Sequence, residues 1–227
     1  MNASEVYRAG RIAFMGVELA VAPGALIPRE ETELLGRTAL SIIRQSQQAR
    51  VIDMCCGSGN LACAIAHQVP HAEIWASDLT DGCVEVARRN VERLGLSARV
   101  TVAQGDLFQG FAGVALEGTV DVIVCNPPYI SVKRLEGERA GLLEHEPREA
   151  FDGGPYGLSI HQRVVRDAPA FLRPGGTLLF EVGVGQDRQV AALFGRARAY
   201  EDIKIVSDAS GNGRVVYGRR STPPSPE

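Results

Sequence analysis

Apolar and polar residues alternate along the chain with two different periods, and the order of these periods predicts the secondary structure. Residues 11–22 alternate around Met15 and Gly16, which is typical of a β-hairpin. Apolar residues then recur at helical spacing from Leu34 to Ile43, after acidic residues that favour a helix N-terminus. Beyond this helix we expect strands at residues 51–54, 74–77, 100–103, 120–125 and 177–182, and helices at residues 61–67, 82–94, 161–172 and 188–194.

This alternation of strands and helices predicts an α/β fold with a mostly parallel sheet covered by helices on both faces. Two further strands, at residues 203–206 and 214–217, flank a glycine-containing turn and are expected to form an antiparallel hairpin. We therefore divide the chain into an N-terminal hairpin and linker (residues 1–25), one main domain (residues 26–218) and a tail (residues 219–227) that is expected to be disordered.

A glycine-containing loop joins the strand at residues 51–54 to the following helix. Glycine lets the backbone turn tightly and leaves room for a ligand near the main chain. Ligands of parallel α/β sheets bind at the carboxyl ends of the strands. We therefore expect ligand contacts from Cys55, Cys56, Gly57, Ser58 and Gly59. The two glycines alone are weak evidence, since an ordinary turn explains many such pairs.

The charge of Asp53 distinguishes two ligands that this loop could bind. Gly57, Gly59 and Ala62 also fit the dinucleotide pattern, and Asp78 lies where that pattern places a ribose-binding acid. Asp53, however, stands directly before the loop, where its carboxylate would repel a pyrophosphate. S-adenosylmethionine has an ammonium and a sulfonium instead of phosphates, and its ribose hydroxyls can bind Asp78. The alternative for Asp78 is a solvated acid that caps the next helix.

A third acid, Asp106, follows the next predicted strand. Its side chain is expected to accept a hydrogen bond from an adenine amino group, with Leu107 and Phe108 covering the ring. An ordinary turn aspartate is the alternative when Asp106 is considered alone. Three acids at the ends of successive strands favour one ligand-binding edge of the sheet.

Asn126-Pro127-Pro128-Tyr129 directly follows the apolar strand at residues 120–125. Consecutive prolines fix φ and prevent helix formation, so the turn is expected to be rigid. The Asn126 side-chain oxygen and the Pro127 carbonyl can each accept a hydrogen bond from one NH2 group, and Tyr129 can stack on a planar group. The turn therefore predicts a site for a planar nitrogen substrate. Asn126, Pro127 and Tyr129 are the candidate catalytic residues, with Asn126 positioning and polarising the substrate rather than acting as a general base.

The composition excludes several classes of protein. The 227 residues include 24 Lys and Arg against 27 Asp and Glu, and the net charge of −3 argues against a protein that coats nucleic acid non-specifically. No apolar run approaches the roughly 18 residues of a membrane-spanning helix. The five cysteines form no Cys-x-x-Cys pair and no export signal is evident, so we expect no metal site and a cytoplasmic location.

These motifs together resemble the protein-(glutamine-N5) methyltransferases of peptide-chain release factors, the HemK/PrmC type. Residues 26–33, Leu-Ile-Pro-Arg-Glu-Glu-Thr-Glu, resemble the family's Leu-Ile-Pro-Arg-Pro-Glu-Thr-Glu, and residues 126–130 match its substrate turn. The family pattern is also followed by Glu146-Pro147, Gly153-Gly154, Gly157-Leu158, Pro174-Gly175-Gly176 and Glu181-Val182-Gly183. The resemblance covers residues 8–219.

The resemblance implies a Rossmann-like class I methyltransferase with a seven-stranded sheet and S-adenosylmethionine as its methyl donor. It implies that Asn126 faces both ligands, that Pro127, Pro128 and Tyr129 face the substrate, and that the cofactor contacts residues 55–59, Asp78, Leu79 and Leu107. The expected acceptor is a carboxamide nitrogen, either glutamine N5 of a release factor or related protein, or the nitrogen of a small molecule.

The sequence also departs from the family pattern. The family loop reads Asp-Leu-Gly-Thr-Gly-Ser-Gly, whereas Cys55 and Cys56 replace its first glycine and its threonine. We interpret them as two small buried residues, with a redox pair as the alternative. Glu30 replaces a proline, and Tyr156 replaces an aspartate. The family also has a helical N-terminal domain, and this sequence is expected to begin at the hairpin that follows it.

Three other functions stay open at this point. Methylation of an exocyclic amine of a nucleic-acid base uses similar turns, but the acidic net charge and the lack of an evident nucleic-acid module disfavour it. Asp53 and the lack of a hydride-transfer constellation disfavour an NAD-dependent oxidoreductase. Asn126 and Tyr129 disfavour a silent binding module. The charged stretch at residues 133–149 is interpreted either as a lid over the substrate or as a solvated loop.

Overall fold

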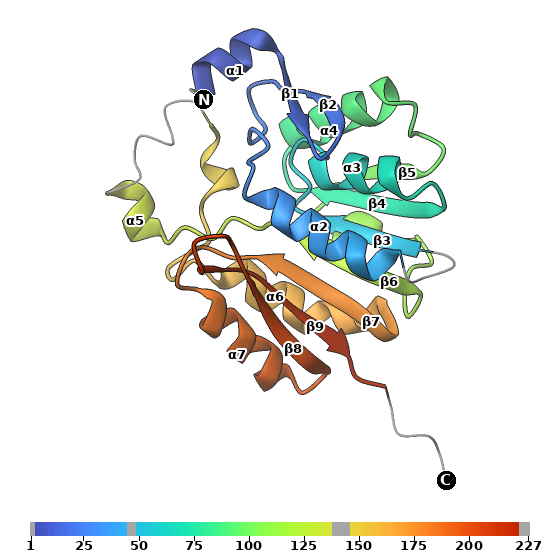
Figure 1. Ribbon diagram of the computed structural model, residues 1–227, viewed down its shortest axis with the longest axis vertical. Coiled ribbons are helices and arrows are strands. Elements are labelled where there is room, and N and C mark those ends of the chain that lie inside the picture. Colours follow the sequence, from blue (N-terminus) through green and yellow to red (C-terminus); the bar gives the residue numbers. More distant parts are fainter. Residues whose placement is uncertain (1–2, 45–48, 138–145, 223–227) are drawn as a thin grey trace.

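The computed structural model describes residues 3–44, 49–137 and 146–222. They form a central sheet with helices on both faces, and a separate small hairpin near the N-terminus (Figure 1). The helices are α1 (Ala3–Ala9), α2 (Thr32–Ile43), α3 (Asn60–Gln68), α4 (Asp81–Arg93), α5 (Val132–Glu136), α6 (Ser159–Asp167) and α7 (Asp187–Ala197), with short 3-10 helices η1 (Leu107–Phe111), η3 (Arg148–Ala150) and η4 (Ala168–Ala170). The strands are β1 (Arg11–Phe14), β2 (Val17–Ala20), β3 (Ala49–Met54), β4 (Ala72–Asp78), β5 (Val100–Gln104), β6 (Val120–Cys125), β7 (Leu172–Glu181), β8 (Tyr200–Ser207) and β9 (Gly213–Arg220).

The sheet confirms the predicted α/β class. Its seven strands lie in the order β5-β4-β3-β6-β7-β9-β8. The first five in this order are parallel, and β9 is antiparallel to both β7 and β8. The chain moves outward from β3 to β5 and then returns to β6, which pairs with β3 so that Met54 lies opposite Cys125. The glycine loop and the Asn-Pro-Pro-Tyr turn therefore leave adjacent strands at the point where ligands of such sheets bind.

Successive residues of the central strands pack into two different cores, as expected for a sheet covered on both faces. Val51 and Val122 are buried in the core shared with α2, α3 and α4. Their neighbours Ile52 and Ile123 are buried in the opposite core, shared with α6 and α7. Both cores fix the strand ends that carry the candidate site.

The N-terminal hairpin is confirmed, with Arg11 opposite Ala20. Asn90 of α4 joins this hairpin to the glycine loop: its Oδ1 accepts a hydrogen bond from the Ala20 backbone nitrogen at 2.7 Å, and its Nδ2 donates to the Ser58 carbonyl at 3.0 Å. Helix α1 precedes the hairpin and was not expected from the sequence. Val6 of this helix packs in a small cluster of its own, against residues that follow the hairpin.

Several predicted boundaries differ from the structure. The helix expected at residues 161–172 ends at Asp167, because Pro169 has no N–H to continue it and Leu172 pairs with Val120 at the start of β7. Strand β9 continues to Arg220, beyond the domain boundary predicted at residue 218. Residues 223–227 of the expected tail, and residues 138–145 of the charged stretch, lie outside the described residues.

In the described part of the chain, no helix is both long enough and apolar enough to cross a membrane.

Candidate functional site

The glycine loop turns through backbone conformations with positive φ. Cys55, Gly57 and Gly59 have φ values of 58°, 53° and 74°. A Cβ placed on Gly57 would meet no atom within 4 Å, so open space lies above this residue. A Cβ on Gly59 would lie 3.2 Å from the Cβ of Ala87, so this glycine also lets the loop pack against α4. Cys55 adopts the same left-handed region with a side chain, which costs about 1 kcal/mol.

Asp53 is buried beneath this loop and is only 1% exposed. Its Oδ2 accepts a hydrogen bond from the Ala62 backbone nitrogen in α3 at 2.9 Å. Among the described residues, its Oδ1 has no hydrogen-bond partner. Burial raises the pKa of Asp53 from its ordinary value of 3.8 to about 7. A buried carboxylate oxygen without a partner is suited to a cationic ligand and would repel an anionic one.

Asp78 ends β4 and reaches across to the glycine loop. Its Oδ2 accepts a hydrogen bond from the Gly57 backbone nitrogen at 2.9 Å, and its Oδ1 accepts one from the Thr80 backbone nitrogen at 3.3 Å. Leu79 follows with 57% of its surface exposed. Asp78 therefore shapes the loop, while its neighbour Leu79 presents an apolar edge to the same space.

Asp106 and Leu107 also reach this space, but Phe108 does not. Asp106 accepts a hydrogen bond from Arg163 Nη2 at 2.7 Å, and both side chains are partly exposed. Leu107 has a φ of 55° and is buried. Phe108 stacks on Phe171, with ring centroids 4.4 Å apart. Since Phe108 lies in the core, the expectation that it covers a ligand ring is wrong.

We call the space above the glycine loop the first pocket. The predicted cofactor residues that line it are Asp53, Cys55, Cys56, Gly57, Ser58, Asp78, Leu79, Asp106, Leu107 and Asn126. Gly59 is the one predicted cofactor residue outside this lining. The Ser58 side-chain oxygen, like Asp53 Oδ1, is buried with no hydrogen-bond partner among the described residues. Acids from three strands therefore meet in one pocket, as the sequence predicted.

The Asn-Pro-Pro-Tyr turn separates the first pocket from a second one. Pro127 and Tyr129 line the second pocket, Pro128 lines the first, and Asn126 lines both. Asn126 Nδ2 donates a hydrogen bond to Thr32 Oγ1 at 3.1 Å. Asn126 is therefore the predicted site residue that a ligand in either pocket can contact.

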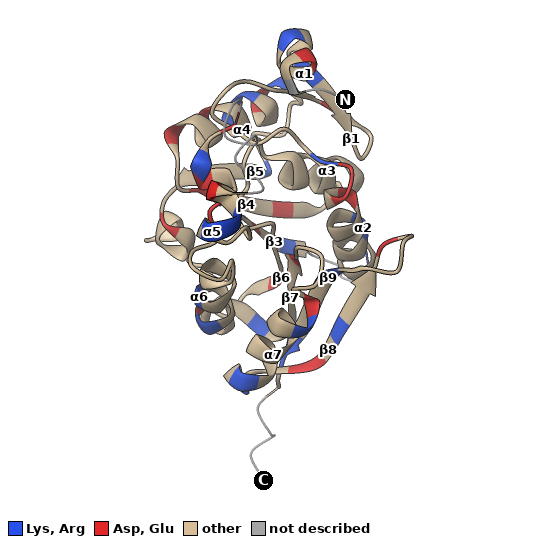
Figure 2. Cartoon of the chain, turned by 90° about the vertical axis from the view of Figure 1, so that its left-hand side faces the viewer, with Lys and Arg blue, Asp and Glu red and all other residues tan. Residues whose placement is uncertain are grey.

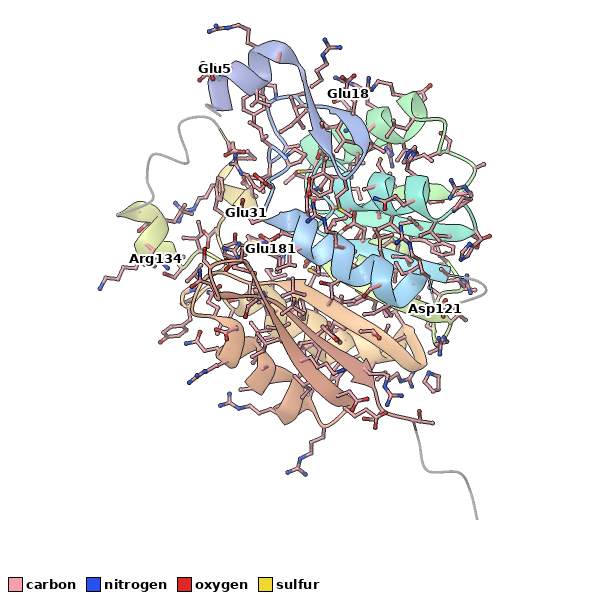
Figure 3. The ribbon with its side chains drawn as sticks, in the orientation of Figure 1. Glu5, Glu18, Glu31, Asp121, Arg134 and Glu181 are labelled. Carbon is pink, nitrogen blue, oxygen red and sulfur yellow. The ribbon has the colours of Figure 1, made fainter. Side chains whose placement is uncertain are left out.

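The second pocket is lined by charged residues that the sequence analysis did not select as site residues. Glu181 is 2% exposed, and its Oε1 accepts a hydrogen bond from the Tyr129 hydroxyl at 3.3 Å. Arg214 Nη2 lies 3.5 Å from the same oxygen. Glu31 at the start of α2 lies beside Glu181 at the end of β7 (Figure 3). Burial raises the pKa of Tyr129, so its hydroxyl keeps its proton. Burial also raises the pKa of Glu181, and the nearby Arg214 opposes this shift.

Residues 26–29 and residues around Pro147 also line the first pocket, and the two segments are joined to each other. The backbone nitrogen of Ile27 donates a hydrogen bond to Glu146 Oε1 at 3.0 Å, and Arg29 forms an ion pair with the same carboxylate. Glu146 and Arg29 stand in the quoted family motifs, as do Thr32 and Glu181, so the sequence contained a signal for them. Arg214 had no such signal.

The comparisons with known proteins decide the family. The family model of the methyltransferase small domain matches residues 32–142. A release factor glutamine methyltransferase from Geobacter sulfurreducens is 40% identical over 213 residues, which are 94% of this chain and 72% of that protein. The chain belongs to the release factor glutamine methyltransferase family. A second member, from Moorella thermoacetica, is 36% identical over 94% of this methyltransferase and 74% of its own length.

Solved structures agree with this assignment. The protein-(glutamine-N5) methyltransferase (release factor-specific) from Alicyclobacillus acidocaldarius superimposes with a TM-score of 0.53 at 26% identity, covering 90% of this methyltransferase and 100% of that chain. A methyltransferase from Pyrococcus furiosus has a TM-score of 0.65 at 16% identity, covers 97% of each chain, and shows the shared class I fold.

The methyltransferase uses S-adenosylmethionine, and the first pocket fits this donor. The unpartnered Asp53 oxygen suits its positive charges, the open space above Gly57 admits a ligand next to the backbone, and Asp78 faces the same space. When bound, S-adenosylmethionine supplies an electrophilic methyl group on a sulfonium. The buried carboxylate of Asp53 would not suit the pyrophosphate of NAD, which removes the oxidoreductase alternative on physical grounds as well.

Proposed function

We propose that this methyltransferase transfers a methyl group to the side-chain carboxamide nitrogen of a glutamine in a peptide-chain release factor. The observation that carries the proposal is the position of Asn126, which lines both pockets at the turn between them. The names of the relatives from Geobacter sulfurreducens and Moorella thermoacetica support glutamine as the acceptor.

The chemistry of an amide explains why the turn must be rigid. The lone pair of an amide nitrogen is delocalised into the carbonyl, so this nitrogen is a poor nucleophile. Asn126 Oδ1 and the Pro127 carbonyl would accept hydrogen bonds from the two hydrogens of the acceptor NH2 group and direct its lone pair at the first pocket. Fixing reactants in this way contributes up to about 7–11 kcal/mol in favourable cases.

Tyr129 lines the pocket proposed for the acceptor. Tyr129 is largely buried beside the acceptor pocket, and its hydroxyl is held by Glu181. The acceptor nitrogen would form a bond to the methyl carbon as the carbon–sulfur bond breaks, with the electron pair of that bond staying on sulfur, and the nitrogen would then release one hydrogen as a proton to solvent. Because burial raises the pKa of Tyr129, we assign this residue to packing against the planar amide and not to removing that proton.

The acceptor is most directly tested by methyl transfer to purified proteins. The chain is incubated with methyl-labelled S-adenosylmethionine and a bacterial release factor, and tandem mass spectrometry locates the label. We expect one labelled methyl group on a glutamine side-chain nitrogen. Label on another protein or on a small carboxamide, with none on the release factor, would contradict the proposed acceptor.

Methylation of nucleic acid is the second outcome that this assay can detect. Lys and Arg are interspersed with Asp and Glu over the face shown in Figure 2, which favours a protein acceptor over the phosphate backbone of a nucleic acid. Transfer of label to RNA or DNA would replace the proposal. We also propose a cytoplasmic location, because all five cysteines are free thiols.

A further inference from the structure

Thr32 lines the first pocket and Glu181 lines the second, and the Asn-Pro-Pro-Tyr turn lies between these pockets. The proposed function uses Glu181 only to hold the Tyr129 hydroxyl and gives Thr32 no role. Thr32 is the first residue of α2, and Glu181 is the last residue of β7. Each is 2% exposed, although each carries a polar side chain. Buried polar groups are costly unless they are hydrogen-bonded, so their placement against the site requires an explanation.

The hydrogen bond between Asn126 and Thr32 has a defined direction. Asn126 Nδ2 and Thr32 Oγ1 are 3.1 Å apart. A hydroxyl group has one hydrogen to donate, and an ionised carboxylate can only accept. The Thr32 hydroxyl lies beside the Glu181 carboxylate, and Glu181 Oε2 is buried with no other hydrogen-bond donor among the described residues. Thr32 therefore donates its hydroxyl hydrogen to Glu181, and Thr32 Oγ1 accepts a hydrogen bond from the Asn126 nitrogen.

This direction determines how Asn126 presents its amide group. With its nitrogen toward Thr32, the Asn126 oxygen faces away from Thr32. In the reversed orientation Asn126 would offer N–H groups to the NH2 group of the acceptor, and two sets of donors cannot form a hydrogen bond. The side-chain amide of an asparagine has two nearly isosteric orientations, so a neighbouring group must select one.

The same carboxylate also orients the other end of the turn. Glu181 Oε1 accepts the hydrogen bond of the Tyr129 hydroxyl at 3.3 Å. Arg214 Nη2, 3.5 Å from this oxygen, favours the charged form of the carboxylate. One buried acid thus holds Tyr129 directly and Asn126 through Thr32.

We propose that Thr32 and Glu181 are positioning residues that fix the Asn126 amide with its oxygen toward the methyl acceptor. The inference rests on the proposed function, because it assumes that the acceptor offers an NH2 group. It adds that the orientation of Asn126 is set by the contacts from Asn126 to Thr32 and from Thr32 to Glu181, which we call the relay, and not by the acceptor itself.

The decisive variants are Thr32→Val and Thr32→Ser. Valine has nearly the shape of threonine and no hydroxyl, whereas serine keeps the hydroxyl. We expect Thr32→Val to lower kcat/KM for the release factor about tenfold, which corresponds to one lost polar interaction, and Thr32→Ser to restore most of that loss. Thr32 also lines the first pocket, so binding of S-adenosylhomocysteine is measured by calorimetry, and it should fall much less than kcat/KM in either variant.

Thr38→Val is the matched control on the same helix. Thr38 Oγ1 donates to the Leu34 carbonyl within α2 at 2.7 Å and lies outside both pockets. This control should keep wild-type kcat/KM. Equal losses in Thr32→Val and Thr32→Ser would show that Thr32 acts through packing, and a wild-type value in Thr32→Val would show that the relay has no effect on catalysis. Either result would overturn the proposal.

A second measurement needs no acceptor and therefore separates this inference from the proposed function. The side-chain amide hydrogens of Asn126, assigned by NMR, should exchange slowly with solvent in the wild type and in Thr32→Ser, and faster in Thr32→Val. If the wild type fails to methylate a release factor, the proposed function is wrong and this comparison still decides the relay. If the Asn126 amide hydrogens exchanged as slowly in Thr32→Val as in the wild type, the result would contradict the relay.

Discussion

The carboxylate of Asp78 accepts a hydrogen bond from the backbone nitrogen of Gly57 at 2.9 Å. The residue predicted to bind a ribose therefore also holds the loop that is expected to contact the cofactor. The predicted ribose contact and the observed loop contact would use the same side chain at the end of β4. This explains how a loop with several residues at positive φ is kept in one conformation before a ligand arrives.

Replacing Asp78 should weaken cofactor binding. We expect Asp78→Ala to reduce the affinity for S-adenosylhomocysteine by roughly 1–3 kcal/mol, because polar contacts to the ligand and to the loop are both lost. Isothermal titration calorimetry measures this directly. Asp81→Ala, three residues further at the exposed start of α4, is the control and should bind as the wild type does. An unchanged dissociation constant for Asp78→Ala would place the ligand elsewhere.

Cofactor binding should also depend on pH through Asp53. The pKa of Asp53 is raised to about 7 by burial, and only its ionised form attracts a cation. The affinity for S-adenosylmethionine should therefore rise up to roughly tenfold per pH unit below 7 and level off above it. Calorimetry across this range should show the step in the wild type and not in Asp53→Asn. A pH-independent wild type would exclude Asp53 as the group that meets the positive charge.

The same group should affect stability in the opposite direction. Between its ordinary pKa of 3.8 and about 7, Asp53 keeps a proton in the folded state that it loses in the unfolded state. The free energy of unfolding of the ligand-free protein should therefore fall over this range as the pH rises, relative to Asp53→Asn. Chemical denaturation of both proteins at several pH values gives this difference, and parallel curves would contradict the assignment.

Asn126 should be required for transfer and much less for cofactor binding. We expect Asn126→Ala to lower kcat by at least about a hundredfold, because the acceptor nitrogen is no longer oriented. Asn212→Ala, in the turn between β8 and β9, is the control for loss of an asparagine outside the site. If Asn126→Ala had the same kcat as Asn212→Ala, the result would contradict the positioning role of Asn126.

Cys55 should be a strained residue. Its φ of 58° favours glycine, so Cys55→Gly should unfold with a free energy about 1 kcal/mol larger than Cys55→Ala, which lacks the thiol but keeps the Cβ. Comparing these two variants with each other cancels the lost contacts of the thiol. Urea denaturation measures the difference. Equal stabilities would show that the backbone of this loop is relaxed when Cβ is present.

The sequence predicted the regular elements well because their signals are local. Strand β6 was placed at its observed bounds, and β3 differs by two residues at one end, since buried parallel strands are short apolar runs between glycine and proline signals. The start of β7 was missed because Pro174 and Gly175 indicate a turn. In the structure they lie within the strand, next to an irregularity in the register between Val120 and Val122.

The candidate site was predicted only where its residues lie at the end of a strand or directly after it. Asp53, Asp78 and Asn126 were selected for that reason. The partners that orient them are distant in sequence: Thr32 is 94 positions from Asn126, and Glu181 is 52 positions from Tyr129. Such contacts depend on how the strands are ordered in the sheet, and a periodic pattern contains no information about that order. Arg163, which pairs with Asp106, was missed for the same reason.

The account depends on two pockets that meet at Asn126, and a crystal structure with both ligands tests it most directly. The protein is co-crystallised with S-adenosylhomocysteine and a release factor. We predict that the sulfur atom lies in the first pocket near Asn126 and that a glutamine side chain from the release factor enters the second pocket, its nitrogen facing the sulfur. Electron density for the cofactor outside the first pocket, or for a glutamine that does not reach Asn126, would contradict the account.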